Sequence, residues 1–326
     1  MPGVRGGIGN GRRLVRGMPQ LFEQGCVKLK TNPIHWGKSW RSNMSKPVLF
    51  AILALALAAS ACGINLNLPE AKAPGPEVTD EISIPLSDAE PVRLTLEFGA
   101  GELYLSPGAQ DSLVSGTATY NVPDFKPEIL TDGGDVVIKQ GEYQVSGIPN
   151  FEGLKNEWNL QLGTQPMSLE IKAGAYQGEF DLGGLGLTSF SVSDGAAEVT
   201  VDFSTLNPAK MSLLTYKTGA SNVTLKNLAN ANFVSMVFDS GAGNYKLDFG
   251  GELQRDASVS IQSGMSNLTL VIPEGVAATV KVNGGLSNVQ FPAGWSQSGD
   301  LYTQTGEGPS LTIVIEMGAG NVQITQ

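Results

Sequence analysis

The chain has 326 residues, including 41 glycines, and 16% of its residues are charged. This composition is typical of a globular protein rich in turns, and the length is sufficient for two units and a sizeable core. From Cys62 onward the chain has 12 basic and 30 acidic residues, a net charge of −18. Such a surface is well solvated, and its charge argues against nucleic acid as a partner.

Residues 44–61 are typical of an export signal. Met44, Ser45 and Lys46 precede an apolar run at residues 47–59. Because this run is shorter than the ~20 residues that span a bilayer, a cleaved signal peptide is favoured over a transmembrane helix. Residues 1–43 carry eight basic residues and one acidic residue, which a signal peptide does not need. We therefore interpret 1–43 as a mis-assigned or disordered extension and Met44 as the initiator.

The end of the signal resembles the bacterial lipobox. Ala59, Ser60 and Ala61 are small residues that precede Cys62, although the usual residue three places before the cysteine is leucine. The resemblance implies cleavage after Ala61 and lipidation of Cys62. Each buried lipid CH₂ contributes ~0.8 kcal/mol, so two or three acyl chains anchor a protein stably. We expect an exported protein that is anchored at the cell membrane or the outer envelope surface.

Processing at Cys62 removes much of the reactive chemistry of the chain. The only histidine, His35, and the only other cysteine, Cys26, lie upstream of the expected cleavage site. This excludes a Ser/His/Asp triad, a cysteine nucleophile and a zinc site of histidine and cysteine from the mature protein. It also excludes structural disulfides. We predict no enzyme, no cofactor and no metal.

The remaining chain has three expected parts. Residues 62–81 carry Pro69, Pro74 and Pro76 and are predicted to form an extended tether. Short runs of alternating apolar and polar residues follow, and they predict strands. We expect an N-terminal β unit at 82–165 and a repeat domain at 166–326.

The repeat consists of short copies that begin with glycine and a small residue. The copies start at positions 99, 195, 219, 241, 264, 285 and 318, and a degenerate copy starts at Tyr176. A strand, a small-residue corner and a second strand at intervals of about 22 residues predict an all-β solenoid that resembles a parallel β-helix. Glycine would allow a positive φ at the corner. A β-sandwich is the competing fold. The last copy ends at Gln326 without an obvious cap, so an open terminal edge is expected.

The chain resembles the toast-rack domains of bacterial envelope proteins, which are related to cell-wall-active antibiotic response proteins and adhesin-like domains. The segments at 96–105 (LEFGAGELYL), 156–162 (NEWNLQL), 167–171 (MSLEI) and 180–187 (FDLGGLGL) and the glycine copies carry the resemblance. It implies a right-handed coil, no catalytic residues, and an association with membrane segments or stress-response systems.

One position of the repeat is occupied by asparagine in five copies. We predict a structural ladder there, because asparagine tolerates left-handed backbone geometry and stacked amides bond along a stack. Glu102, Glu179 and Glu198 are expected at the same position in other copies. A row of cation ligands that includes Asp194 and Asp239 is the alternative. The ladder residues are Asn222, Asn244, Asn267, Asn288 and Asn321.

Two further sets of residues are candidates for binding or catalysis. Trp295 and Tyr302 lie in the long interval before the last copy and would form a binding loop if exposed, or the core of a small hairpin if buried. Trp158 is expected to be buried.

Carboxylate pairs could support a polysaccharide-acting enzyme on a β-helix, which is a remote alternative. These pairs are Glu179 with Asp181 and Asp239 with Asp248.

The sequence favours a noncatalytic envelope lipoprotein that binds or senses an envelope protein or a glycan, in connection with envelope stress. The alternative is a structural or adhesive element whose stack self-associates through its open end.

Overall fold

The computed structural model describes residues 74–141 and 153–326. The chain divides into two units, Met1–Leu66 and Asn67–Gln326, and every described residue belongs to the second. The expected extension, the signal peptide at 44–61, the lipobox with Ala61 and Cys62, and most of the tether lie outside the described residues. In the part of the chain that is described, no helix has the length and hydropathy to cross a membrane.

The described chain is almost entirely β structure, which confirms the all-β class. Two short 3-10 helices, η1 (Pro123–Phe125) and η2 (Leu228–Ala231), accompany the strands. The strands are β1 (Val78–Pro85), β2 (Val92–Pro107), β3 (Ser112–Tyr120), β4 (Pro127–Asp132), β5 (Asp135–Gln140), β6 (Asn156–Leu162), β7 (Met167–Asp181), β8 (Leu187–Asp202), β9 (Met211–Lys226), β10 (Phe233–Asp248), β11 (Ala257–Val271), β12 (Ala277–Gln290), β13 (Ser296–Ser298), β14 (Leu301–Gln304) and β15 (Ser310–Thr325).

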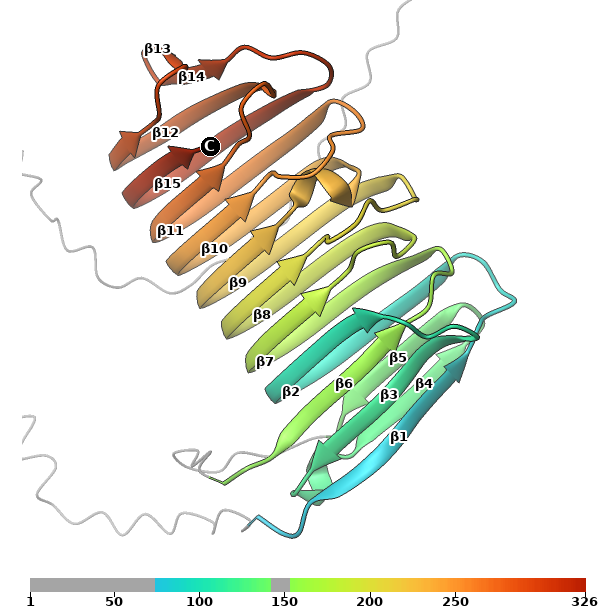
Figure 1. Ribbon diagram of the computed structural model, residues 1–326. Helices are drawn as coiled ribbons and strands as arrows, with labels where there is room; N and C mark the ends of the chain where they lie inside the picture. Colours follow the sequence, from blue (N-terminus) through green and yellow to red (C-terminus); the bar gives the residue numbers. More distant parts are fainter. Residues whose placement is uncertain (1–73, 142–152) are drawn as a thin grey trace, which may run out of the picture. The chain divides into compact units, whose positions relative to one another are not determined.

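Eight long strands form a parallel stack in the order β2, β7, β8, β9, β10, β11, β15 and β12 (Figure 1). We call each of these strands a rung. Identical motif positions lie side by side in neighbouring rungs; for example, Asn244 is in register with Asn222 and with Asn267. The repeat therefore predicted the stacked strands correctly, while the handedness of the coil stays a prediction.

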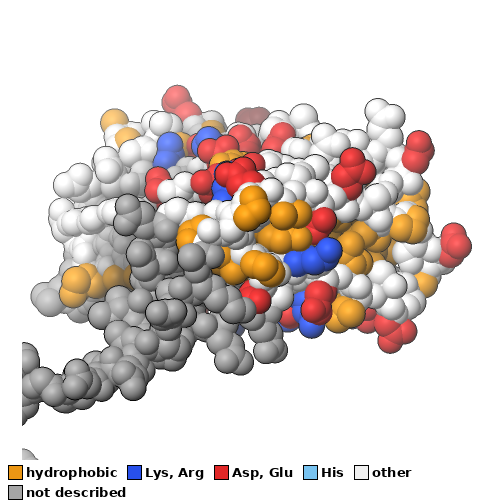
Figure 2. Space-filling model, turned by 90° about the horizontal axis from the view of Figure 1, so that it is seen from below, with side chains coloured by type: hydrophobic (Ala, Val, Ile, Leu, Met, Phe, Trp, Pro, Cys, Tyr) orange, Lys and Arg blue, Asp and Glu red, His pale blue; other side chains and the backbone are white. Residues whose placement is uncertain are grey.

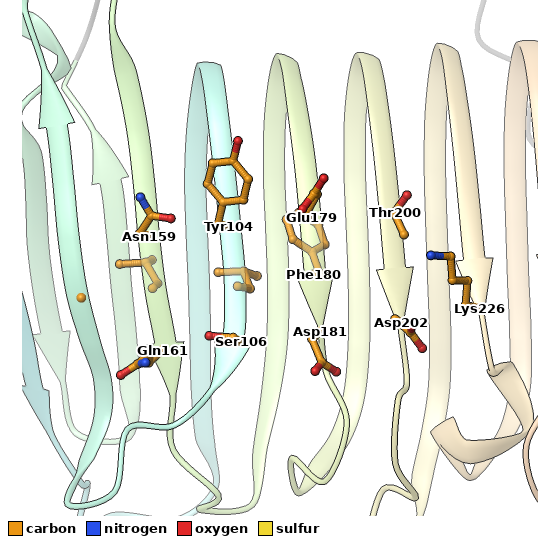
Figure 3. A pocket seen from close by; sticks show the side chains of 13 residues that line it. Tyr104, Ser106, Asn159, Gln161, Glu179, Phe180, Asp181, Thr200, Asp202 and Lys226 are labelled. Carbon is orange, nitrogen blue, oxygen red and sulfur yellow. The ribbon is translucent and has the colours of Figure 1, made fainter.

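Each rung bends near its middle and so has a first arm and a second arm, as Figure 3 shows for neighbouring strands of the stack. In β10, alternate residues of both arms are buried, including Phe238 in the first arm and Tyr245 in the second. The ring centroids of these two residues are 5.2 Å apart. The two arms therefore enclose a single core from opposite sides, and the other faces of both arms point outward.

The glycine at most bends is required by the closeness of the neighbouring rung. A Cβ atom on Gly264 would lie 2.7 Å from the carbonyl oxygen of Gly241, and one on Gly318 would lie 2.7 Å from that of Gly264. None of these three residues has a positive φ, so the first glycine of the motif is required for space, and the expected positive φ at the corner belongs to another glycine of the same motif. Positive φ occurs two residues later, at 156° in Gly243 and 143° in Gly320.

At the N-terminal end of the stack the two arms of β2 have different partners. The first arm pairs with β5, and the second arm pairs with β6, which is followed by β3 and β1. Along its whole length β2 also pairs with β7. A strand from the expected N-terminal unit is thus hydrogen bonded to the first strand of the repeat domain; the boundary between 165 and 166 stays a prediction.

At the C-terminal end the rungs do not follow the order of the sequence. The last strand, β15, lies between β11 and β12, and β12 is the final rung. The first arm of β12 is covered on its other side by β14, which pairs with β13. The expected open edge at Gln326 was therefore wrong, because the chain builds β12, adds the hairpin of β13 and β14, and then returns to fill the space beside β11.

Trp158 is fully buried, as expected. Its exposed fraction is 0%, and its ring packs edge-on against Phe98 with centroids 5.1 Å apart. This contact links β6 to β2 at the first bend of the stack.

Candidate functional site

The asparagine position forms a hydrogen-bonded ladder along the outside of the second arms. The side-chain amide of Asn244 donates to Asn222 Oδ1 at 2.9 Å, Asn267 donates to Asn244 at 3.0 Å, and Asn321 donates to Asn267 at 2.8 Å. Asn288 is in register with Asn321 at the end of the row. The predicted bonding along the stack is confirmed for four of the five residues. The left-handed backbone is not, since none of the five has a positive φ.

The acidic members of this row differ from the prediction at one position. Glu198 is in register with Asn222, and its partner in β7 is Gln177 rather than Glu179. Glu102 is in turn in register with Gln177. Glu179 therefore lies two residues further along its strand, because the degenerate copy begins at Gly174 and not at Tyr176.

Next to this row, a groove of about 690 Å³ crosses the outer face of the second arms (Figure 3). Its polar side chains come from β6, β2, β7, β8 and β9, and each projects outward because alternate residues of these strands face the core. The polar residues that line it are Tyr104, Ser106, Asn159, Gln161, Glu179, Asp181, Thr200, Asp202 and Lys226.

Tyr104 is the aromatic side chain that projects into the groove. It is half-buried, and its hydroxyl donates a hydrogen bond to Glu102 Oε2 at 3.1 Å. Partial burial raises the pKa of Tyr104, and the nearby carboxylates of Glu102, Glu157 and Glu179 raise it further. The hydroxyl therefore stays protonated at neutral pH, and the ring is held in one orientation.

The groove is acidic. It contains the carboxylates of Glu179, Asp181 and Asp202 and one amine, that of Lys226. Asp181 Oδ1 accepts hydrogen bonds from Ser204 Oγ at 2.6 Å and from the Gly183 amide at 3.0 Å. Asp202 Oδ1 accepts one from Asn227 Nδ2 at 2.7 Å. Acidic side chains are also spread over the face shown in Figure 2, with hydrophobic side chains gathered near its middle.

Of the two carboxylate pairs singled out in the sequence, only one is brought together. Glu179 and Asp181 lie on the same outward face of β7 and both line the groove. Asp239 lies on the first arm of β10 and Asp248 on its second arm, so these two face opposite sides of the stack.

A second polar cluster lies inside the bend of β8 and β9, and the sequence did not predict it. The carboxylate of Asp194 accepts hydrogen bonds from Tyr216 at 2.9 Å, from Tyr176 at 3.3 Å and from the Thr218 hydroxyl. Thr218 Oγ1 also lies 2.5 Å from Ser221 Oγ. Burial raises the pKa of Asp194, although the hydroxyl donors oppose that shift.

The structure separates the two aspartates of the proposed cation row. Asp194 is in register with Thr218 on the inner side of the bend, whereas Asp239 is in register with Lys217 and is exposed. They therefore do not share a face. Among the residues that the structure describes, no cluster of three or more aspartate, glutamate, histidine or cysteine side chains is placed to hold a metal ion.

Trp295 and Tyr302 are buried, with exposed fractions of 8% and 6%. Tyr302 packs edge-on against Phe291 with ring centroids 5.1 Å apart, and its hydroxyl accepts a hydrogen bond from Gln297 Nε2 at 3.1 Å. Both rings belong to the same continuous core as the buried residues of the rungs. Their burial agrees with the alternative in which the hairpin packs its own aromatic residues, and it contradicts an exposed pair of binding rings.

The fold and the groove define a class of protein: an all-β stack of bent parallel strands with an acidic outer face. Residues 73–213 match the family model described as the N-terminal domain of toast_rack, DUF2154. This part of the chain is a toast-rack N-terminal domain, which confirms the resemblance seen in the sequence. No curated protein sequence matches the chain.

Several solved structures are similar to this chain. One is a proposed cell adhesion protein from Clostridium sporogenes ATCC 15579, with 23% identity, coverage of 77% of this chain and 100% of that chain, and a TM-score of 0.45. Another is a proposed adhesin from Bacteroides fragilis NCTC 9343, with 12% identity, coverage of 76% and 97%, and a TM-score of 0.41. A third is a proposed lipid binding protein from Parabacteroides distasonis ATCC 8503, with 11% identity, coverage of 77% and 98%, and a TM-score of 0.36. The family assignment rests on the sequence match to residues 73–213 alone.

Proposed function

We propose that this protein is a noncatalytic surface module that binds neutral or amino-bearing glycans in the groove on its second arms. In this proposal it is exported and held at a membrane by lipid on Cys62. The observation that carries the proposal is the combination of one fixed aromatic ring, that of Tyr104, with planar amide and carboxylate groups at regular spacing on a rigid sheet.

The side chains of the groove suit a polyhydroxylated ligand. Neighbouring strands are ~4.8 Å apart, so Asn159, Tyr104 and Glu179, which are in register on β6, β2 and β7, follow one another along the face at that spacing. Amides donate and accept hydrogen bonds, and carboxylates accept them, which matches rows of sugar hydroxyls. The Tyr104 ring offers an apolar surface for the C–H face of a sugar.

The charge of the groove selects among glycans. With Glu179, Asp181 and Asp202 against Lys226, the groove repels polyanions and accepts neutral or cationic chains. Asp181 and Asp202 are held by hydrogen bonds from their own chain. This arrangement supports recognition by fixed groups, without a step of bond cleavage.

Calorimetric titration of the full-length protein in mild detergent with three tetrasaccharides tests the proposal. The tetramers of N-acetylglucosamine and of glucosamine should bind, and the tetramer of galacturonic acid should not. Tyr104→Ala should weaken binding about tenfold, since loss of one aromatic contact is worth ~1.4 kcal/mol. Thr269→Ala lies on the same face of β11 outside the groove and should bind like the wild type. Absence of binding to both neutral and amino tetramers, or a Tyr104→Ala variant equal to the wild type, refutes the proposal.

A further inference from the structure

The outer face of the first arms, on the side of the stack opposite the groove, is unusually poor in charge. Two rows of residues cross rungs β8, β9, β10, β11 and β15 there, and no member is charged, in a chain whose net charge from Cys62 onward is −18. Leu213, the second residue of the first row, is 42% exposed. The rows are Ser189, Leu213, Ser235, Ser258 and Thr312, and Ser191, Thr215, Val237, Ser260 and Val314. We call these ten residues the neutral face.

A third row, next to the bend, carries charges in a particular order. From β7 to β15 its residues are Lys172, Ser193, Lys217, Asp239, Gln262 and Glu316. All six are exposed. The charges of this row have opposite signs at positions equally far from its two ends. Lys172 is the first residue and Glu316 the last, while Lys217 is third from one end and Asp239 third from the other.

From this order we propose that two copies of the chain associate through their neutral faces about a twofold axis that lies between β9 and β10 and runs along the strands. Such an axis keeps each row opposite itself and reverses the order of the rungs, as an isologous interface requires. Lys217 of one copy then faces Asp239 of the other, and Lys172 faces Glu316. Each pair occurs twice. This inference goes beyond the proposed glycan groove, which lies on the opposite arms and remains open in such a dimer.

The available area is sufficient for a stable interface. Eight rungs at ~4.8 Å and an arm of about seven residues at ~3.3 Å give a face of roughly 38 by 23 Å. Two copies would cover on the order of 1,700 Å² in total, which lies within the range of stable protein–protein interfaces. The neutral rows occupy the centre, and Arg93 of β2, Glu170 of β7 and Lys281 of β12, which continue these rows at their ends, lie at the rim together with the charged row. A neutral centre with a charged rim is usual in such interfaces. Two sheets packed face to face in this way keep their strands nearly aligned.

The charges of the third row also have neighbours within one copy. Lys217 and Asp239 are in register on adjacent rungs, and Lys172 Nζ lies 3.3 Å from Glu97 Oε1 and 3.7 Å from Glu170 Oε2. In contrast, Lys172 and Glu316 are separated within a copy by four intervening rungs, about 24 Å across five spacings. A coupling between Lys172 and Glu316 therefore requires a second copy.

Sedimentation equilibrium of the full-length protein in density-matched mild detergent, combined with charge-reversal variants, tests the dimer. The wild type should form dimers. Lys172→Glu and Glu316→Lys should each weaken association more than about tenfold, because each places two like-charged pairs in the interface. The double variant should recover dimerisation, and an equimolar mixture of the two single variants should form heterodimers. Lys246→Glu makes the same change of charge on the second arm of β10 and should leave association unchanged.

Three results would overturn the proposal. They are a monomeric wild type at high protein concentration, single variants that associate like the wild type, and a double variant that fails to recover while its melting temperature matches that of the wild type. Binding of the tetrasaccharides by a monomeric protein would leave the groove in place and remove the dimer, so the two proposals fail separately.

Discussion

Replacing a bend glycine by alanine should have opposite effects at two equivalent positions of the stack. In Gly264→Ala the new Cβ would lie 2.7 Å from the carbonyl oxygen of Gly241, so two rungs must separate. Gly285 occupies the same place in the final rung, and a Cβ there meets no atom within 4 Å. Neither residue has a positive φ, so alanine is compatible with both backbones.

The expected sizes follow from these surroundings. Forcing an extra carbon into a filled space costs ~1–3 kcal/mol, whereas alanine in a compatible open position stabilises by ~0.4–1 kcal/mol through the unfolded chain. For a chain of this size, each kcal/mol changes the melting temperature by ~2–4 °C. Gly264→Ala should melt ~2–12 °C below the wild type, and Gly285→Ala at or above it.

Thermal unfolding followed by circular dichroism at 218 nm, a wavelength typical of β structure, measures both variants under identical conditions. The reasoning is refuted if Gly264→Ala melts with the wild type, or if Gly285→Ala loses as much stability as Gly264→Ala. Either result would mean that the spacing between rungs does not require glycine at the bend.

Three further predictions concern polar groups. Asp194→Ala should lower the free energy of unfolding by ~1–3 kcal/mol, because it removes the acceptor of Tyr176, Tyr216 and Thr218, while Asp194→Asn should lose less at pH 7. Denaturant titrations of both variants measure this, and equal losses would count against the cluster. The folded pKa of Asp194 is raised, so the folded state binds more protons at this group than the unfolded state, whose value is about 3.8. The stability of the wild type relative to Asp194→Asn should therefore fall as pH rises from about 3.8 through the folded pKa and then level off; a difference that grows with pH contradicts the direction. Asn244→Ala breaks two hydrogen bonds of the amide ladder and should lower the free energy of unfolding by about 1 kcal/mol. Asn288→Ala, at the end of the row, should lower it less, and comparing the melting temperatures of the two variants checks this order.

The sequence contained enough information to predict the stacked strands but not their complete order. The last five rungs, β9, β10, β11, β12 and β15, carry the same pattern of bend glycine, outward asparagine and alternating apolar residues, so β15 can pair beside β11 as well as β12 could. Pairing energy depends on this shared pattern, and the sequence gives no preference between the two copies. The unusual length of the interval before the last copy was the only sign in the sequence that the last strand does not follow the preceding copy in the stack.

The misplaced Glu179 has a related cause. A shift of two residues along a strand leaves inward residues inward and outward residues outward, so periodicity alone cannot detect it. The register of Gln177 with Glu198 shows the true alignment. The glycine and small residue that begin the other copies are present at Gly174 and Ala175, and this signal in the sequence was missed.

The groove could be predicted only in part, since its side chains come from distant positions in the chain. Tyr104 and Glu179 are direct neighbours across β2 and β7, although 75 positions separate them in the sequence. The buried cluster at Asp194 had a signal that was missed. The residues just before successive bend glycines, Asp194, Thr218, Ser240 and Ser263, are all polar where alternation predicts the core side.

The position of β15 between β11 and β12 makes the 16 residues Ser310–Thr325 an interior part of the sheet. A chain emerging from a ribosome or an export channel can stack its first rungs in order, but β12 lacks its parallel neighbour until β15 has followed. A product cut short near its end would carry a gap between two strands, with unpaired backbone groups on both sides. Completion of the stack thus requires that Ser310–Thr325 has been delivered.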